Sequence, residues 1–370
     1  MSLPVERSLP RLLVATGPVP ASEVARLGHG APSASPTSAG QEVREGSDYD
    51  TDRLVRMLQP AQAVRARRGW RAWLRLGPSQ RELQERARLE AVRAQFDRPV
   101  TVMVANPKGG TGKTPISLLL AGEFGDARGG GVVVVDNNEN RGTAAFRSHF
   151  PHRRTVADLL EDADALERPE AQFTDLAFYL AHQIAGKYYV LASDESVTRQ
   201  LDEERFIRLH RILSRFFAVI VIDSGNNELA SNWLAGLEVA DALVVPTQWR
   251  QDHLVTANKM LEKLRSRRHP ILERTLIVGT NAPAAAQAGP RKAALDWFSS
   301  EHRLPVVEIP TDAHIHEGGV LNRSKMGAGT RAAGLAAAAV AARLMVDAAA
   351  RPTSRSRPST QSPKQRPDGR

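Results

Sequence analysis

Short apolar runs alternate with helical stretches over residues 100–346 of this 370-residue chain. Residues 202–216 and 252–265 are two of the helical stretches. The apolar runs are rich in β-branched residues and predict strands at 100–105, 132–135, 188–191, 217–222, 242–245, 275–278 and 306–309. Continuous apolar strands separated by helices are typical of a mainly parallel sheet that is covered on both faces. We therefore predict an α/β fold with a mainly parallel, doubly wound sheet, in which ligands bind beyond the carboxyl ends of the strands.

The segments that flank this region have a different composition. Residues 1–60 mix apolar patches with turn formers and are predicted to be mostly disordered. Residues 61–98 are predicted to form an arginine-rich helical arm that carries Trp70 and Trp73. Ser79 is placed to cap the second helix of this arm, with Glu82 at the capping-box position. The α/β domain is assigned to residues 99–350, and the tail, residues 351–370, has too little apolar surface to fold.

The net charge of +9 is concentrated in two of these segments. Residues 61–98 hold ten arginines against four acidic residues, and residues 351–370 hold six basic residues against one. Cationic arms on a near-neutral body point to an anionic polymer or lipid surface as a partner. Two plainer interpretations stay open: the tryptophans dock the first arm against the α/β body, and the tail only solubilises the chain.

Several other kinds of chemistry find no support. The chain has no cysteine, which rules out disulfides and thiolate metal sites and makes a reducing cytoplasm the expected location. No apolar run approaches the ~20 residues of a membrane span, and the N-terminus lacks the layout of a signal peptide. The histidine pairs His149/His152 and His314/His316 lack the supporting acids of a metal site. No G-x-S-x-G nucleophile motif is present.

Residues 100–115, VTVMVANPKGGTGKTP, carry the strongest sign of chemistry. A β-type run leads into a glycine-rich turn, which is followed by Lys113, Thr114 and an apolar helix. Glycines let the backbone wrap around a phosphate so that consecutive N–H groups face its oxygens, and the helix start adds its positive dipole end. Lys113 would reach the β- and γ-phosphates, and the Thr114 hydroxyl would ligate Mg²⁺. The alternative is a turn between strand and helix that binds no ligand.

The loop departs from the usual G-x-x-x-x-G-K-[ST] pattern, because Pro107 stands where the first glycine belongs and Lys108 follows it. This form, K-G-G-T-G-K-T, resembles the deviant Walker A loop of the ParA/MinD family of dimerising ATPases, which are P-loop NTPases of the SIMIBI type. The resemblance implies that Lys108 crosses the dimer interface to the nucleotide of the partner subunit. It implies a cradle for ATP formed by Lys108, Gly109, Gly110, Thr111, Gly112, Lys113, Thr114 and Pro115.

Two strand ends supply acidic residues beside this loop. Asp136 follows the strand at 132–135, and Asp223 follows the strand at 217–222. The run Asp-Ser-Gly-Asn that begins at Asp223 resembles the Walker B strand and second switch of the family. A carboxylate at a strand tip beside a phosphate loop is well placed to hold Mg²⁺ or its water ligands. We therefore assign Thr114, Asp136 and Asp223 to the metal.

Asn138 stands where the family usually has a second aspartate, which helps to position the attacking water. An amide can orient water but cannot accept its proton, so hydrolysis is expected to be slow or to use another group, with Asp136 and Glu139 as candidates. The alternative is that Asn138 only shapes the switch loop and that the protein is a nucleotide-gated clamp with weak turnover. The predicted catalytic residues are Lys108, Lys113, Asp136 and Asn138.

Two further residues are assigned to the base by the same resemblance. Asn281 follows the strand at 275–278, and its amide would read the adenine edge. Pro310 lies in the segment that matches the family's loop after the last strand, which packs along the base.

The resemblance covers residues 65–346. The segments 69–79 and 309–320 look like those of actinobacterial MinD/ParA-like ATPases of type VII secretion or conjugative loci. The resemblance implies ATP and Mg²⁺ as cofactors, a homodimer that forms on ATP binding, and a partner protein that stimulates hydrolysis. Three functions compete: a partition or conjugation ATPase that binds DNA without sequence preference, a membrane- or secretion-associated accessory ATPase, and a weakly hydrolysing scaffold. The expected location is the cytoplasm, at the nucleoid or at an anionic membrane surface.

Overall fold

The computed structural model describes residues 77–138, 142, 144–148, 154–193, 201–282 and 288–349. Some sequence predictions fall outside these described residues, namely those for 1–60, Trp70, Trp73, Glu139, His149, His152, the side chain of Asn281 and 351–370.

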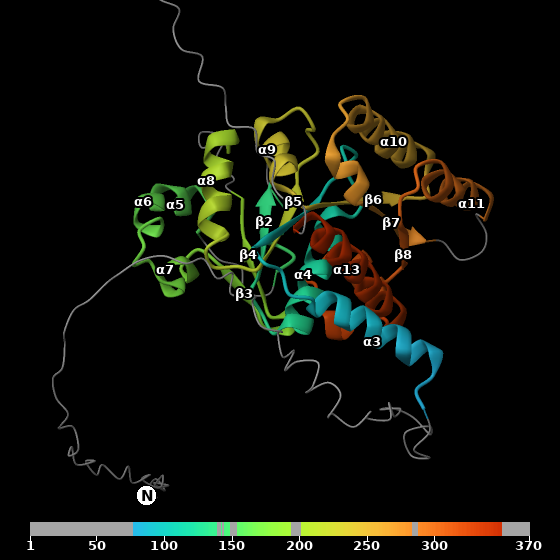
Figure 1. Ribbon diagram of the computed structural model, residues 1–370, viewed down its shortest axis with the longest axis horizontal. Coiled ribbons are helices and arrows are strands. Elements are labelled where there is room, and N and C mark those ends of the chain that lie inside the picture. The colour runs from blue at the N-terminus through green and yellow to red at the C-terminus, as the bar shows by residue number, and fades with distance from the viewer. Residues whose placement is uncertain are drawn as a thin grey trace, which may run out of the picture. The chain divides into compact units, whose positions relative to one another are not determined.

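Eight strands form one sheet in the order β3-β4-β2-β5-β1-β6-β7-β8 (Figure 1). They are β1 (Val100–Val104), β2 (Val132–Asn137), β3 (Ala181–Gln183), β4 (Tyr188–Leu191), β5 (Val219–Ser224), β6 (Ala242–Gln248), β7 (Thr275–Ala282) and β8 (Val306–Pro310). Every neighbouring pair is parallel except β3 and β4. The mainly parallel sheet is therefore confirmed. β3 was not predicted, because three residues are too few to show a period.

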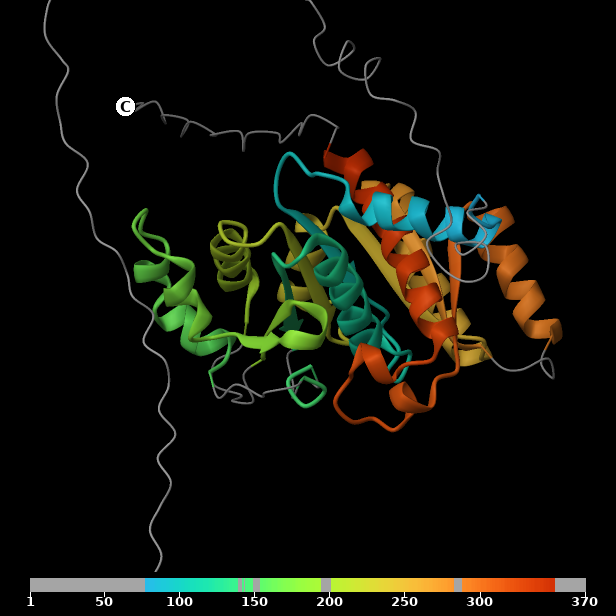
Figure 2. The same cartoon turned by 90° about the horizontal axis from the view of Figure 1, so that it is seen from below.

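Helices cover both faces of the sheet, which confirms the doubly wound arrangement (Figures 1 and 2). The helices are α3 (Gln80–Arg93), α4 (Lys113–Arg128), α5 (Val156–Glu161), α6 (Ala163–Leu166), α7 (Phe173–Ala177), α8 (Glu203–Leu213), α9 (Ser231–Val239), α10 (Gln251–Ser266), α11 (Ala288–Asp296), α12 (Ala313–His316) and α13 (Ala328–Ala349). Val102 and Val104 of β1 belong to the core that α4 and α13 cover, and Met103 belongs to the core beneath α8, α9 and α10. All five residues of β1 are buried, which explains its uninterrupted apolar run.

β2 and β5 continue past the ends that the sequence predicts. Their parallel pairing places Asp136 opposite Asp223 and Asn137 opposite Ser224. Both acidic residues therefore lie inside the strands, not after them, and both are buried. The apolar pattern stops before these positions, so the sequence could not show how far the pairing extends.

α13 has 22 residues, half of them alanine. Its length and composition would allow it to span a membrane, so the expectation that no apolar run approaches that length was wrong. Half of the apolar stretch is buried inside the domain, where Leu335 and Met345 join the core with α4 and β1. α13 therefore closes the fold.

α3 lies along α13 and also contacts α4. Ser79 caps this helix as predicted, because its Oγ accepts a hydrogen bond from the Glu82 amide at 3.2 Å. The other end is fixed by the Arg128 guanidinium of α4, which donates to the carbonyl oxygens of Val92 and Ala94 at 3.1 and 2.6 Å. Residues 80–93 thus pack on the α/β domain.

α4 approaches the connection between β3 and β4 closely at one point. A Cβ added to Gly125 would lie 2.1 Å from the carbonyl oxygen of Gly186. A Cβ added to Gly122, on the preceding turn of α4, would lie 3.8 Å from the Tyr188 ring, an ordinary contact. Packing therefore requires a glycine at 125 but not at 122.

Candidate functional site

The turn between β1 and α4 uses left-handed backbone that favours glycine. Gly110 has a φ of 76° and Gly112 a φ of 93°. Gly112 is also close to β7, because a Cβ there would lie 3.3 Å from Cγ2 of Thr280. These two glycines let the chain turn directly from β1 into the start of α4.

Side chains from the neighbouring strands hold this loop by its carbonyl groups. Gln248 Nε2 donates to the Gly110 carbonyl at 2.9 Å, and Thr280 Oγ1 donates to the Thr111 carbonyl at 2.9 Å. Within the described part of the chain, the amides of Gly110 and Gly112 donate to no protein acceptor. Fixed carbonyls and unused amides at a helix start suit an anionic ligand.

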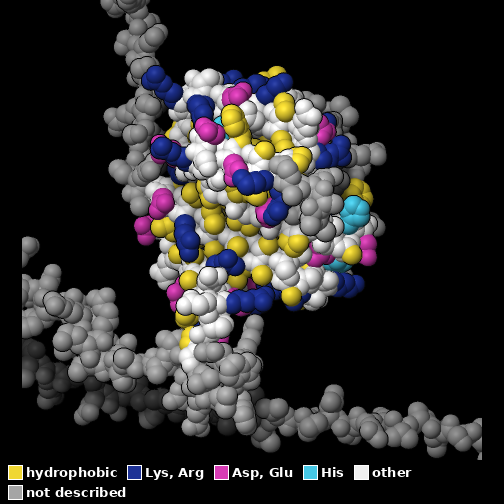
Figure 3. Space-filling model, turned by 90° about the vertical axis from the view of Figure 1, so that its right-hand side faces the viewer, with side chains coloured by type: hydrophobic (Ala, Val, Ile, Leu, Met, Phe, Trp, Pro, Cys, Tyr) yellow, Lys and Arg dark blue, Asp and Glu magenta, His cyan; other side chains and the backbone are white. Residues whose placement is uncertain are grey.

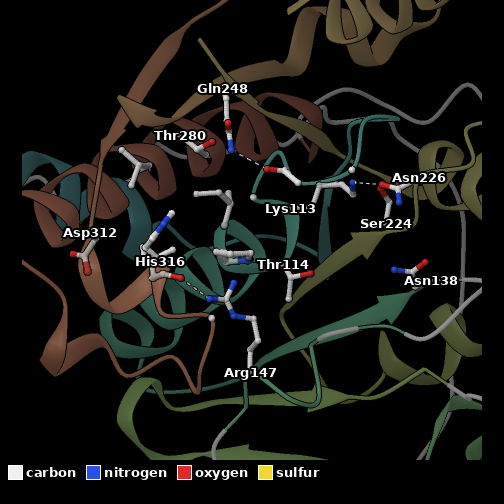
Figure 4. Close-up of a pocket in the computed structure, with 18 of the residues that line it drawn as sticks. Lys113, Thr114, Asn138, Arg147, Ser224, Asn226, Gln248, Thr280, Asp312 and His316 are labelled. Carbon is white, nitrogen blue, oxygen red and sulfur yellow. Dashed lines mark hydrogen bonds between the residues drawn. The ribbon is translucent and has the colours of Figure 1, made fainter. Parts of the chain in front are cut away.

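Lys113 is directed back into the loop. Its Nζ donates to the Asn106 carbonyl at 3.0 Å, to the Lys108 carbonyl at 3.2 Å and to Asn226 Oδ1 at 2.6 Å (Figure 4). Burial lowers the pKa of Lys113 to about 8, and the charge of Asp223 opposes this change. The ammonium group is therefore desolvated, and its hydrogen bonds go to neutral acceptors. Its positive charge would favour a negatively charged ligand at this position.

Lys108, the other lysine of the loop, makes a different contact. Its Nζ lies 3.4 Å from Oδ2 of Asp252, in the first turn of α10. Both side chains are about two-fifths exposed, at 42% and 43%. The structure thus separates the two lysines: Lys113 lies inside the loop, and Lys108 lies on its outer side.

Asp136 and Asp223 form a buried carboxylate pair at the ends of β2 and β5, whose backbones are about 4.8 Å apart. Burial and the nearby Asp223 raise the pKa of Asp136. Burial likewise raises the pKa of Asp223, although hydrogen bonds from Thr114 and Ser117 oppose the rise. The Ser117 hydroxyl donates to Asp223 Oδ1 at 3.1 Å. The structure therefore brings Thr114 and Asp223 together, as the metal prediction requires.

The pair has the properties of a cation site. Asp136 Oδ1 is buried and has no hydrogen-bond partner among the described residues. Asp136 Oδ2 accepts from the Ala144 amide at 3.2 Å, and a Cβ on Gly142 would lie only 1.8 Å from it, so the chain passes directly over this carboxylate. Two adjacent buried carboxylates with an unused oxygen fit a hard divalent cation such as Mg²⁺. In the described ranges no group of three His, Cys, Asp or Glu side chains could hold a metal by itself, so phosphate and water would supply further ligands.

A cavity of about 550 Å³ adjoins the loop, a size typical of sites for small molecules and cofactors. Figure 4 shows Asn138 and Asn226 at one end of it and Asp312 and His316 at the other, with Thr114 between them. The other predicted residues that line it are Gly109, Gly110, Gly112, Lys113, Pro115 and Pro310. The backbone of Asn281 lies in β7, and its side chain is outside the described residues.

Gln248, Asn226 and Arg147 are among the lining residues that the sequence analysis did not assign to the site. Gln248 and Asn226 contact the loop as described above, and Arg147 reaches the cavity from a turn after β2. Arg147 Nη2 donates to the Ile315 carbonyl at 2.7 Å, and burial lowers the pKa of Arg147. Their positions after strand ends were visible in the sequence, but which of them face the cavity depends on loop geometry.

Comparisons with known proteins agree with the fold. No protein-family model and no curated protein matches the sequence. A ParA family ATPase from Chlorobium tepidum TLS superposes with a TM-score of 0.51 at 21% identity, covering 68% of this chain and 98% of that chain. The cell division ATPase MinD from Pyrococcus furiosus gives 0.50 at 21%, covering 67% and 98%. An McdA variant from Cyanothece in complex with ATP gives 0.50 at 16%, covering 66% and 96%. At these identities the likeness establishes the fold.

Proposed function

We propose that this chain is an ATP-binding switch ATPase of the ParA/MinD type, with ATP and Mg²⁺ as cofactors. The observation that carries the proposal is the loop with two lysines: Lys113 is desolvated inside the turn, while Lys108 pairs with Asp252 on the outer side of the loop. The fold that it shares with a ParA family ATPase and MinD supports this assignment. That an McdA protein was solved with ATP supports the choice of nucleotide.

The residues divide the work as follows. The amides of the glycine loop and Nζ of Lys113 would bind the β- and γ-phosphates, which replace the neutral acceptors that Lys113 now contacts. Thr114, Asp223 and Asp136 would hold Mg²⁺ or its water ligands. When bound, Mg²⁺ supplies neutralisation of the phosphate charge.

Hydrolysis would be slow in this proposal. Asn138 lines the cavity at the end nearest Asn226, where it can orient a water molecule. Its amide cannot take the proton from that water. This observation favours a second candidate, a nucleotide-gated scaffold that binds ATP and turns it over weakly.

ATP would also control assembly. Lys108 lies on the outer side of the loop with a two-fifths exposed side chain, which leaves it able to reach a nucleotide in a second copy of the chain. We propose that ATP closes a homodimer through this lysine and that a further protein stimulates turnover.

DNA is the surface that we propose for this dimer, as in a partition or conjugation ATPase, with cytoplasmic, nucleoid-associated location. The excess positive charge lies in residues 61–98 and 351–370. On the face of the domain in Figure 3, basic side chains are interspersed with acidic and apolar ones. Binding through the arms would be electrostatic and independent of sequence.

Two experiments test these proposals. Lys113→Ala should abolish ATP binding in calorimetry, whereas Lys292→Ala, which removes an exposed lysine paired with Asp296, should leave it unchanged. Equal ATP affinity in both variants would refute the assignment of the loop. The ATP-bound chain should then bind duplex DNA with an affinity that falls about 10³–10⁵-fold between 50 and 200 mM salt if at least six phosphates are contacted. Binding to anionic vesicles without DNA binding would favour a membrane-associated role, and ATP binding without turnover would favour the scaffold.

A further inference from the structure

A second cavity lies between α3 and the start of α13, away from the nucleotide loop. It has a volume of about 370 Å³. Four arginines line it, Arg81 and Arg88 from α3, Arg323 from the turn before α13 and Arg331 from α13. Such a concentration of guanidinium groups around one cavity is not required to pack two helices.

The acidic groups near this cavity balance only part of its charge. Arg323 is neutralised by Glu123 of α4, with its Nε at 2.7 Å and its Nη2 at 3.0 Å from the two carboxylate oxygens. Asp126 of α4 is a second acidic neighbour of Arg323, with its Oδ2 3.7 Å from Nε. Glu85 is the acidic residue that lines the cavity itself. Arg331 donates to the Met326 carbonyl, a neutral acceptor. An excess of positive charge therefore remains on the walls.

Arg81 and Arg88 have the clearest unused capacity. Seven residues apart on α3, they lie two turns from each other on the same side of the helix. Within the residues that the structure describes, neither guanidinium group has a hydrogen-bond or ion-pair partner. A planar guanidinium fork matches phosphate geometry with two parallel hydrogen bonds.

We propose that this cleft binds a small molecule that carries a phosphate or diphosphate group, at a site separate from the nucleotide loop. A single carboxylate would bring one negative charge to at least two unpaired guanidinium groups, whereas a phosphoryl group brings about −1.5 to −2. The volume of the cleft lies within the range of small-molecule sites. α3 forms one wall, so the site depends on the segment that precedes β1.

The test is calorimetry with inorganic pyrophosphate. Every protein compared is the full-length chain with Lys113→Ala, which disables the nucleotide loop. We expect 1:1 binding that weakens about ten- to hundredfold in Arg81→Gln/Arg88→Gln, because two charge-assisted contacts are lost. A matched control, Arg267→Gln/Arg343→Gln, removes two charges from exposed arginines that line no part of the cleft and should bind pyrophosphate as before. Glu85→Gln should bind at least as tightly as its parent, because it removes an acidic group from the wall.

Three outcomes of the pyrophosphate measurements would overturn the proposal. These are the absence of pyrophosphate binding in the parent, equal binding in the cleft variant and the control, or weaker binding in Glu85→Gln. Duplex DNA that binds through Arg81 and Arg88 while pyrophosphate does not would also overturn it, in favour of a nucleic-acid surface. Circular dichroism would check that the cleft variant keeps the helix content of its parent. The nucleotide proposal is tested separately, because it depends on Lys113 in the wild-type chain.

Discussion

Lys108 is held within its own subunit by Asp252, and we expect this contact to oppose ATP-driven dimerisation. If Lys108 must reach the nucleotide of a second subunit, the ion pair at 3.4 Å has to break in each protomer as the dimer closes. Asp252→Asn removes the attraction and keeps the shape of the side chain. It should therefore tighten the ATP dimer, whereas Lys108→Ala should prevent it.

The exposure of the pair sets the size of the effect. Both side chains are about two-fifths exposed, so solvent and salt screen their attraction. An ion pair of this kind changes an equilibrium constant by at most about fivefold. Since two pairs break in each dimer, Asp252→Asn should lower the dimer dissociation constant by at most about 25-fold, and by less at high salt.

Sedimentation velocity with ATP and Mg²⁺ over a range of protein concentrations measures this constant. Glu262→Gln is the matched control, because it makes the same charge change on α10 at a residue that contacts Asn258 and not Lys108. A dimer that is unchanged or weaker in Asp252→Asn, relative to this control, would refute the restraining role of the contact. A normal dimer in Lys108→Ala would refute the cross-subunit role of the lysine.

Three further predictions concern turnover, pH and packing. Asn138→Asp should raise the rate of phosphate release from ATP at least about tenfold, because a carboxylate can accept the proton of the attacking water. An unchanged rate would show that residue 138 has only a structural role. Burial alone would raise the pKa of Asp312, but hydrogen bonds from Thr330 and from backbone amides lower this pKa. The contribution of Asp312 to stability is therefore present above its unfolded pKa near 4 and is lost as the pH falls through its folded pKa. Asp312→Asn should therefore unfold more easily in urea at pH 7 and show a smaller loss of stability on acidification, and an equal loss would contradict this. Gly125→Ala should lower the free energy of unfolding by about 1–3 kcal/mol, because its Cβ meets the backbone of the β3–β4 connection, whereas Gly122→Ala should be neutral or stabilising; equal thermal midpoints would contradict the packing argument.

The sheet could be predicted from the sequence because its strands are covered on both faces. Burial on both faces makes each strand a continuous apolar run, and the seven predicted runs all correspond to strands. The error at β2 and β5 has a physical cause: pairing continues through Asp136 and Asp223, whose buried carboxylates break the apolar pattern but not the ladder. β3 escaped prediction because it pairs antiparallel over only three residues.

The loop at 108–114 could be predicted because its chemistry is contiguous in the chain. The contacts that hold it could not, since Gln248, Asn226 and Arg147 lie far away in sequence and reach the loop or its cavity only through the strand order. No local pattern distinguishes an asparagine that contacts Lys113 from one that faces solvent. Topology brings such residues together, and a periodic pattern cannot show it.

In the proposed function, the contacts of the two lysines would link nucleotide binding to assembly. Lys113 is bound to Asn226, which follows β5, and Lys108 is bound to Asp252, which follows β6. Phosphates that take over Nζ of Lys113 would release Asn226, and a second nucleotide that takes over Nζ of Lys108 would release Asp252. Each lysine would therefore exchange a contact within the subunit for a contact with phosphate, and both exchanges would alter segments that follow strands beside β1. A binding step and an assembly step that begin from the same loop would thereby be coupled, without any contact between the two lysine side chains.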